Sequence, residues 1–146
     1  MTAPPLSSET LHASCVAIAG RAVLIGGRSG SGKSDLALRL IDRGAGLVSD
    51  DYTIVRRDGG QLRASAPPTI AGKLEVRGIG IVGFAPQEDV PVALFVDLDA
   101  DPERLPPGGE ARTIAGVAIP TVAVSALEAS APLKVEAALK LLGLSP

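Results

Sequence analysis

A glycine-rich stretch between a short apolar run and an amphipathic segment is the first feature with chemical meaning. It consists of Gly27, Arg28, Ser29, Gly30, Ser31, Gly32, Lys33 and Ser34, and it matches the pattern G-x-x-x-x-G-K-[ST]. Glycines let successive backbone N–H groups turn toward an anion, and the helix that follows adds its partial positive charge. In this pattern the lysine reaches the β- and γ-phosphates and the hydroxyl binds Mg²⁺. The stretch therefore predicts a nucleoside triphosphate site, without deciding between hydrolysis, transfer and sensing.

Two pairs of carboxylates compete to complete this site. Phosphoryl transfer needs an acid that helps to hold Mg²⁺ and a second group that takes the proton of the attacking hydroxyl. Asp97 and Asp99 end an apolar run, where many phosphate-loop hydrolases carry the metal-supporting acid. Asp50 and Asp51 are adjacent, and because neighbouring side chains on a strand point to opposite faces, one of them can face the phosphates. We favour this second pair and expect Asp97 and Asp99 to lie at a solvated strand end.

Four other residues have both a functional and a plain structural interpretation. Glu75 and Arg77 suit a metal ligand beside a phosphate clamp, and equally a surface ion pair on a glycine-kinked edge strand. His12 is the only histidine, and a single histidine is more often a packing or surface residue than a catalytic one. Cys15 is the only cysteine, so it forms no internal disulfide and is expected to be a small buried residue.

The elements that must position these residues are mostly strands. Apolar runs bounded by glycine predict strands at residues 15–20, 21–27, 46–57, 59–67, 89–99 and 113–124. Helical periodicity appears twice, at residues 33–44 and 129–143. Residues 69–84 are glycine-rich with strand character, and the expected strand at 46–57 carries the two adjacent acids in its middle. The order of the predicted strands and helices along the chain indicates a mixed α/β fold in which strands outnumber helices.

Length and composition set limits on the class of protein. At 146 residues the chain has the size of one domain, which we expect to span 11–146 after a disordered tail at 1–10. A net charge of −2 and 2% aromatic residues argue against a nucleic-acid partner. No apolar stretch is long enough to span a bilayer, and the N-terminus has no signal-peptide pattern. We therefore expect a cytoplasmic protein with no membrane partner.

A series of motifs in this sequence resembles a known family. In chain order the motifs are "LHASCV", "GGRSGSGKS", "DRGAGLVSDD", "APPTI", "LEVRGIGIVG" and "ERL", and they cover about residues 11–105. The series is similar to that of the bacterial HPr kinase/phosphorylases, which phosphorylate a serine of the phosphocarrier HPr of the sugar phosphotransferase system and can remove that phosphate. The phosphate loop alone would be weak support, whereas "LEVRGIG" and the double aspartate are specific. The resemblance implies a phosphate-loop kinase domain of the HPr kinase/PEP carboxykinase-like type.

The resemblance also implies roles for individual residues. His12 matches the active-site histidine of the family, and Asp51 matches the residue that accepts the serine proton and returns one in the reverse direction. Asp50 would support Asp51. The implied partners are ATP and Mg²⁺ as cofactors, an HPr-like carrier as substrate, and further copies of the chain, as in the hexamers of the family. The implied catalytic residues are His12, Lys33, Asp50, Asp51 and Arg104, and the implied metal ligands are Ser34 and Glu75.

Two departures from the family pattern limit what the resemblance implies. Full-length members carry an N-terminal domain that this sequence lacks, so it resembles short forms made of the catalytic domain alone. The family also has a proline-initiated loop ending in Gly-Arg-Asn, which serves dephosphorylation and subunit contact. The corresponding stretch here, "VSALEASAPLKVEAAL", has no such triplet. The phosphorylase reaction and the hexamer are therefore left open.

Two rival functions also stay open. One is a kinase for a small metabolite or a simple NTPase, which would act without a protein acceptor. The other is a nucleotide-sensing regulatory module that binds ATP without turnover. The set of His12, Asp51, Glu75 and Arg104 favours the protein kinase over a sensor, because a sensor has no reason to keep all four.

Overall fold

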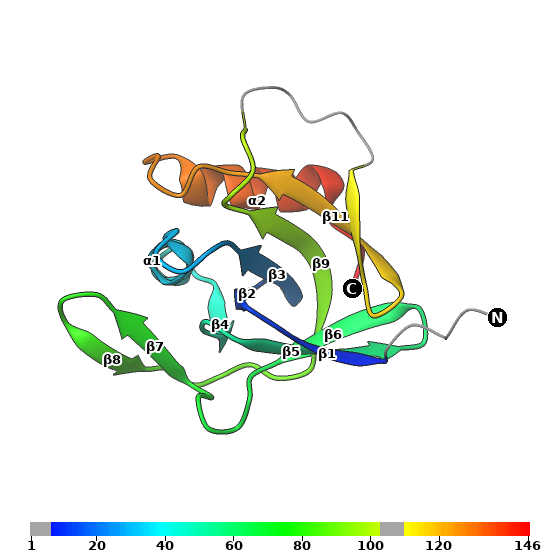
Figure 1. The fold of residues 1–146 in the computed structure, drawn as a ribbon, viewed down its shortest axis with the longest axis horizontal. Helices are drawn as coiled ribbons and strands as arrows, with labels where there is room; N and C mark the ends of the chain where they lie inside the picture. The colour runs from blue at the N-terminus through cyan, green and yellow to red at the C-terminus, as the bar shows by residue number, and fades with distance from the viewer. Residues whose placement is uncertain (1–6, 103–109) are drawn as a thin grey trace.

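A curled sheet of nine strands forms the main body of the molecule (Figure 1). The structure is a computed structural model, and it describes residues 7–102 and 110–146. The strands of this sheet are β1 Ser8–Leu11, β2 Ala13–Ile18, β3 Arg21–Gly26, β4 Gly46–Ser49, β5 Thr53–Asp58, β6 Gln61–Ser65, β9 Val90–Asp97, β10 Ala111–Ile114 and β11 Val117–Ala123. Seven of them follow one another in the order β1-β5-β6-β9-β3-β2-β4. Strand β11 also pairs with β9, and β10 pairs with β11. The predicted mixed α/β fold is confirmed.

Strand β9 holds the sheet together because it pairs with three other strands. It runs parallel to β3 and β11 and antiparallel to β6. Its sequence, "VPVALFVD", is almost continuously apolar, which is typical of a strand covered on both faces. Because β3 lies next to β9, the phosphate loop that leaves β3 begins at the centre of the sheet.

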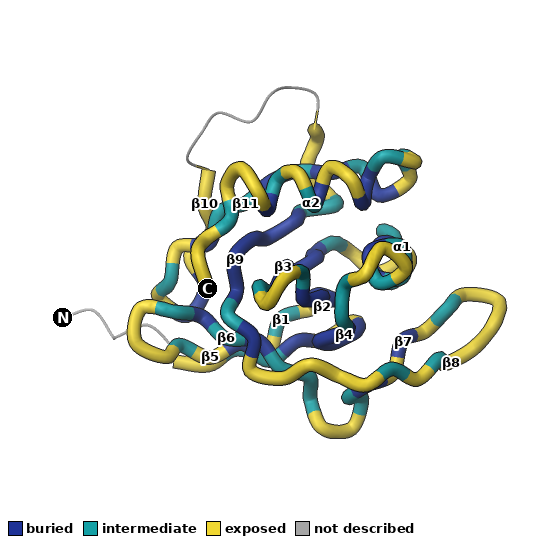
Figure 2. The backbone as a smooth tube through the Cα atoms, turned by 180° about the vertical axis from the view of Figure 1, so that it is seen from behind, coloured by how far each residue is buried: buried dark blue, intermediate teal, exposed yellow. Residues whose placement is uncertain are grey.

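The two helices in the described part of the chain pack on one face of the sheet. They are α1 Lys33–Asp42 and α2 Ala131–Leu142. Val23 of β3 packs with both helices in one core cluster, and its neighbour Leu24 packs in a second cluster that contains no helical residue. This alternation follows from the two-residue period of a strand. In Figure 2 the backbone tube is coloured as buried along most of β3 and β9. Neither helix is long and apolar enough to cross a membrane.

A separate hairpin extends from the body beside α1 (Figure 1). It consists of β7 Lys73–Val76 and β8 Gly80–Gly83, which form a two-stranded antiparallel sheet of their own. Leu74 anchors it, since this side chain is fully buried in the same core cluster as α1. The glycine-rich segment with predicted strand character is therefore a hairpin whose strand β7 packs against α1.

The single strand predicted over 46–57 is wrong. Strand β4 ends at Ser49 and β5 begins at Thr53, so both acids lie in the turn between them. The break occurs at Asp51, whose φ of 67° is incompatible with a strand. The strand predicted over 59–67 contains β6, which pairs with β5 as an antiparallel hairpin up to Asp58 and Gln61.

The sheet also begins earlier in the chain than expected. The N-terminal tail was predicted over 1–10, but residues 8–10 belong to β1, which pairs with β5 from Ser8 opposite Arg56 to Leu11 opposite Thr53. Backbone hydrogen bonds to β5 order this polar segment, and such long-range pairing leaves little trace in local composition. Residues 1–6 of the predicted tail lie outside the described residues.

Candidate active site

The phosphate loop connects the end of β3 to the start of α1. Gly27 leaves no room for a side chain, since a Cβ atom there would lie 2.5 Å from Ser31 Oγ. Gly32 has a φ of 102° directly before the helix, a conformation that glycine adopts without a steric penalty. The first N–H groups of α1 lack partners within the helix and are available to an anion. The backbone therefore has the form that the sequence motif predicts.

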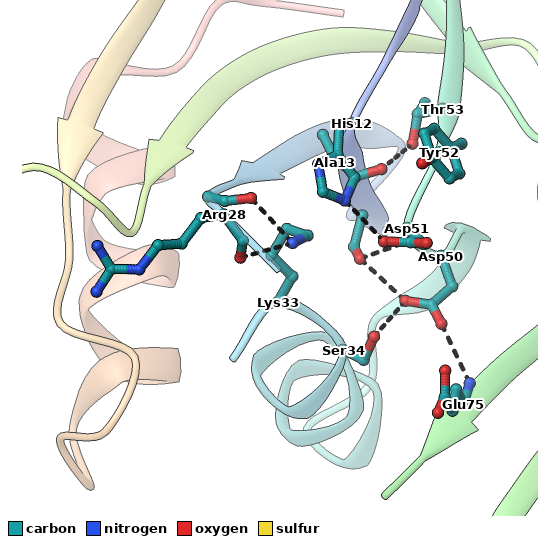
Figure 3. A network of polar contacts seen from close by, with 12 residues as sticks. His12, Ala13, Arg28, Lys33, Ser34, Asp50, Asp51, Tyr52, Thr53 and Glu75 are labelled. Atoms are coloured by element: carbon teal, nitrogen blue, oxygen red, sulfur yellow. Dashed lines mark hydrogen bonds and ion pairs between the residues drawn. The ribbon is translucent and has the colours of Figure 1, made fainter. Parts of the chain in front are cut away.

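The Lys33 side chain lies across this loop (Figure 3). Its Nζ donates hydrogen bonds to the carbonyl oxygens of Gly27, at 2.9 Å, and Arg28, at 3.1 Å. Only 5% of the residue is exposed. The ammonium group is thus held against the loop, where its charge is available to phosphate oxygens.

Asp50 joins the turn after β4 to the first turn of α1 and to strand β7. Its Oδ1 accepts a hydrogen bond from Ser34 Oγ at 2.6 Å, and its Oδ2 accepts one from the backbone N–H of Glu75 at 3.1 Å. Only 6% of Asp50 is exposed. Figure 3 shows this carboxylate between the first turn of α1 and strand β7. Asp50 is therefore placed beside the hydroxyl that is the metal ligand in phosphate loops.

Asp51 faces solvent and is paired with His12. The Nε2 of His12 lies 3.0 Å from Asp51 Oδ1, and 56% of the Asp51 side chain is exposed. The His12 ring also stacks on Tyr52, with ring centroids 5.1 Å apart. His12 precedes β2 and Asp51 follows β4, so the pairing of these two strands brings the residues together. The His12 imidazole therefore orients the Asp51 carboxylate through its Oδ1 atom.

A pocket of about 370 Å³ joins the phosphate loop to Asp51. It is lined by Ser29, Gly30, Gly32, Lys33, Ser34, Asp35, Leu38, Asp51, Glu75, Val76 and Arg77. Glu75 and Arg77 therefore both lie at the pocket, and the structure shows no ion pair between them. His12 lies behind Asp51, where it lines a second, smaller pocket. A phosphate chain on the loop would have its outer end near the Asp51 carboxylate.

Asp97 and Asp99, the competing acids, make structural contacts at the end of β9. Asp97 Oδ2 pairs with Arg112 at 3.1 Å, and its Oδ1 accepts the backbone N–H of Asp99 at 2.9 Å. Asp99 Oδ2 accepts the backbone N–H of Arg28 at 2.9 Å. This pair therefore anchors the phosphate loop from outside the pocket.

Comparison with known proteins gives the family. A sequence profile described as the HPr Serine kinase C-terminal domain matches residues 6–140. The chain belongs to this family. In a solved structure, that of the HPr(Ser) kinase/phosphatase from Coxiella burnetii, the similar chain is 30% identical, with a TM-score of 0.77 over 90% of this chain and 94% of the other.

Curated relatives of the HPr kinase family are similar over part of their length. The HPr kinase/phosphorylase of Limosilactobacillus reuteri is 35% identical over 129 residues, which are 80% of this chain and 40% of the relative. The enzyme of the same name from Clostridium botulinum is 48% identical over 81 residues, 55% of this chain and 27% of the relative. The chain thus spans less than half the length of these two relatives.

The residues at the pocket fit the Mg²⁺ ion that the HPr kinase family implies. Ser34, Asp50 and Glu75 offer only oxygen atoms, which are the donors that Mg²⁺ prefers. Within residues 7–102 and 110–146, no three His, Cys, Asp or Glu side chains converge as a complete metal cage. Arg104, the implied catalytic arginine, lies outside the described residues.

The contacts of three residues at the site were not predicted from the sequence. Ser14 binds both Asp50 and Asp51, Tyr52 stacks on His12, and Asp99 holds the phosphate loop. The signal for Ser14 is weak: this residue directly precedes the predicted strand at 15–20, and a serine buried in a strand must find a hydrogen-bond partner. No comparable signal existed for the others, since their contacts depend on strand pairing.

Cys15 is expected to be unreactive in the folded protein. It is fully buried on β2, and this burial raises the pKa of its thiol, so the nucleophilic thiolate is disfavoured. A thiol reagent at mildly alkaline pH should label the native protein at least about tenfold more slowly than the protein in denaturant. Rapid labelling of one thiol per native chain, followed by stopped-flow absorbance, would contradict this placement.

Proposed function

We propose that this chain is an ATP-dependent, Mg²⁺-requiring kinase that phosphorylates a serine of an HPr-like phosphocarrier protein. One observation carries the proposal: Asp51, held by His12, lines the same pocket as Lys33 and Ser34. A hydrolase needs only to orient water, whereas a carboxylate at the outer end of the phosphate site suits deprotonation of a hydroxyl that enters from solvent.

Each residue has a defined part in this reaction. The serine hydroxyl oxygen forms a bond to the γ-phosphorus while the bond to the β,γ-bridging oxygen breaks, and ADP leaves. The hydroxyl proton passes to Asp51, whose Oδ1 is engaged by His12 and whose Oδ2 is the oxygen offered to the substrate. Lys33 stabilises charge that develops on the phosphate oxygens, and Arg104 is proposed to do the same.

The residues that we propose to bind the metal are grouped around Asp50, which contacts both Ser34 and the backbone of Glu75. When bound, Mg²⁺ would neutralise charge on the β- and γ-phosphate oxygens. Ser34 would supply a direct oxygen ligand, and Asp50 and Glu75 would hold the ion or its water molecules. Asp50 is nearly enclosed and Asp51 is exposed, so we assign them different roles. Asp50 would support the metal ion, and Asp51 would accept the proton of the substrate hydroxyl.

The proposal is limited to the kinase direction. The segment between β11 and α2 packs along α1. Arg39 donates hydrogen bonds to the carbonyl oxygens of Ala126 and Glu128. Ala126 also lies close to Gly32 of the phosphate loop. This segment has no Gly-Arg-Asn triplet, and Glu128 is paired with Lys134. We therefore assign no residue to attack by inorganic phosphate on the phosphorylated carrier.

We also propose the setting in which the chain works. Residues from β1 to α2 would form a single kinase domain, because one curled sheet and its two helices share a continuous core. The domain would act in the cytoplasm, where ATP and HPr-like carriers are found. The family resemblance supports a homo-oligomer. We propose no nucleic-acid partner, because the net charge is −2 and only 2% of the residues are aromatic.

Formation of ADP tests the proposal against its rivals. With ATP and Mg²⁺, the chain should form ADP in proportion to added HPr-like carrier and stop at one equivalent per carrier molecule. A carrier whose acceptor serine is changed to alanine is the control. ADP formation that continues without any carrier would indicate an NTPase or a metabolite kinase. Tight ATP binding without ADP formation would indicate a sensor.

A further inference from the structure

Ser14 is a polar residue inside the apolar strand β2, and its side chain contacts both acids of the site. The residue is fully buried. Its Oγ donates a hydrogen bond to Asp50 Oδ1 at 2.9 Å and accepts one from the backbone N–H of Asp51 at 3.1 Å. We propose that Ser14 is a positioning residue, which sets the geometry of Asp50 and Asp51 for phosphoryl transfer. This inference rests on the proposed kinase function.

Asp51 needs such support because its backbone is strained. Its φ is 67°, and the N–H of Tyr52 donates to the carbonyl oxygen of Asp50 at 2.7 Å, which closes a three-residue turn around Asp51. Turns of this kind with a positive φ at the central residue are rare and persist only where the surroundings hold them. Ser14 Oγ takes the N–H of the central residue. It therefore fixes the direction in which the Asp51 side chain leaves the turn.

The Ser14 hydroxyl also fixes the carboxylate of Asp50. The Oδ1 atom of Asp50 accepts hydrogen bonds from the hydroxyl groups of Ser14 and Ser34, and Ser34 is a proposed metal ligand. Without Ser14, a nearly enclosed carboxylate oxygen would lose one of its two donors and could rotate away from Ser34. One hydroxyl thus couples the metal-supporting acid to the proton-accepting acid.

A second contact between the same two segments provides a matched control. The Thr53 hydroxyl donates to the carbonyl oxygen of Ala13 at 2.8 Å, and Thr53 is also fully buried. This hydrogen bond joins Ala13, which is next to Ser14, to Thr53, which is two residues after Asp51. Its acceptor is a backbone carbonyl rather than a carboxylate. Thr53→Val removes a buried interstrand hydrogen bond of similar length without changing the size of the side chain. A merely structural role for Ser14 predicts the same result from Ser14→Ala and from Thr53→Val.

The experiment compares wild type, Ser14→Ala and Thr53→Val in two measurements. In transfer to the carrier, we expect Ser14→Ala to lower kcat about 10- to 100-fold at saturating Mg²⁺, with the KM for carrier unchanged. In calorimetry of ATP binding at varied Mg²⁺, we expect its half-saturating Mg²⁺ concentration to rise about tenfold. Thr53→Val should match wild type in both once the folded fraction is taken into account.

The outcomes separate this inference from the proposed function. If Ser14→Ala matches Thr53→Val in both measurements, Ser14 has no positioning role. If wild type transfers no phosphate to the carrier, the kinase proposal fails, and the calorimetric comparison still decides whether Ser14 holds the metal-supporting acid. If Ser14→Ala does not fold, Ser14→Cys takes its place, since a thiol is a weak donor of similar size. It should then show the same two changes, and wild-type values for Ser14→Cys would overturn the inference.

Discussion

Asp51→Asn should abolish phosphate transfer to the carrier while ATP binding persists. An amide cannot take the proton of the serine hydroxyl, and loss of a general base costs about 10²- to 10⁴-fold in rate. The fold should survive, because asparagine is among the residues that tolerate a positive φ and its Oδ1 can still contact His12. The measurement is single-turnover transfer from labelled ATP, with calorimetry for ATP affinity.

Asp58→Asn is a suitable control for that variant. Asp58 lies at the β5–β6 turn, where its exposed side chain is 3.8 Å from Arg56, and it does not line the pocket. The substitution changes the net charge by the same amount, and the transfer rate should stay near that of wild type. If Asp51→Asn retained transfer within about threefold of Asp58→Asn, Asp51 would not be the general base.

Lys33→Met should lose both nucleotide affinity and transfer. Methionine keeps much of the apolar stem but lacks the ammonium group, and removing one donor to developing phosphate charge costs about 10²- to 10³-fold. The melting temperature should fall by only about a few degrees, because within the described residues the ammonium makes two hydrogen bonds, both to loop carbonyl oxygens.

The control for Lys33→Met is Lys140→Met in the last turn of α2. Lys140 is exposed and lies outside the pocket, so its loss should leave ATP affinity unchanged. Calorimetry of ATP binding compares the two variants, and thermal unfolding checks the fold. Normal ATP affinity in Lys33→Met would show that the loop does not bind phosphates as proposed.

The sequence predicted those parts of the site that local physics determines. The phosphate loop requires glycine at Gly27 and Gly32 and is followed at once by an amphipathic helix, so motif and element support each other. Strand β9 was also clear from its apolar run. These features depend on residues close together in the chain, where composition and spacing are informative.

The sequence could not predict what depends on strand pairing or on an unusual backbone angle. The turn at Asp51 was taken for a strand because its apolar neighbours on both sides favour one. The two acids differ in direction, as expected from the sequence, but the expected reason was wrong: Asp50 faces Ser34 and Asp51 faces the pocket from a turn rather than from opposite faces of a strand. The link from Ser14 to both acids follows from the pairing of β2 with β4, which no local pattern shows.

The mass of the carrier after reaction tests the central claim most directly. The HPr-like carrier from the same cell is incubated with the chain, ATP and Mg²⁺, and then analysed by intact mass and peptide mapping. We predict the addition of one phosphate, located on a serine, and no addition when Asp51→Asn replaces the wild-type chain. A carrier that stays unmodified while the chain binds ATP would contradict the account.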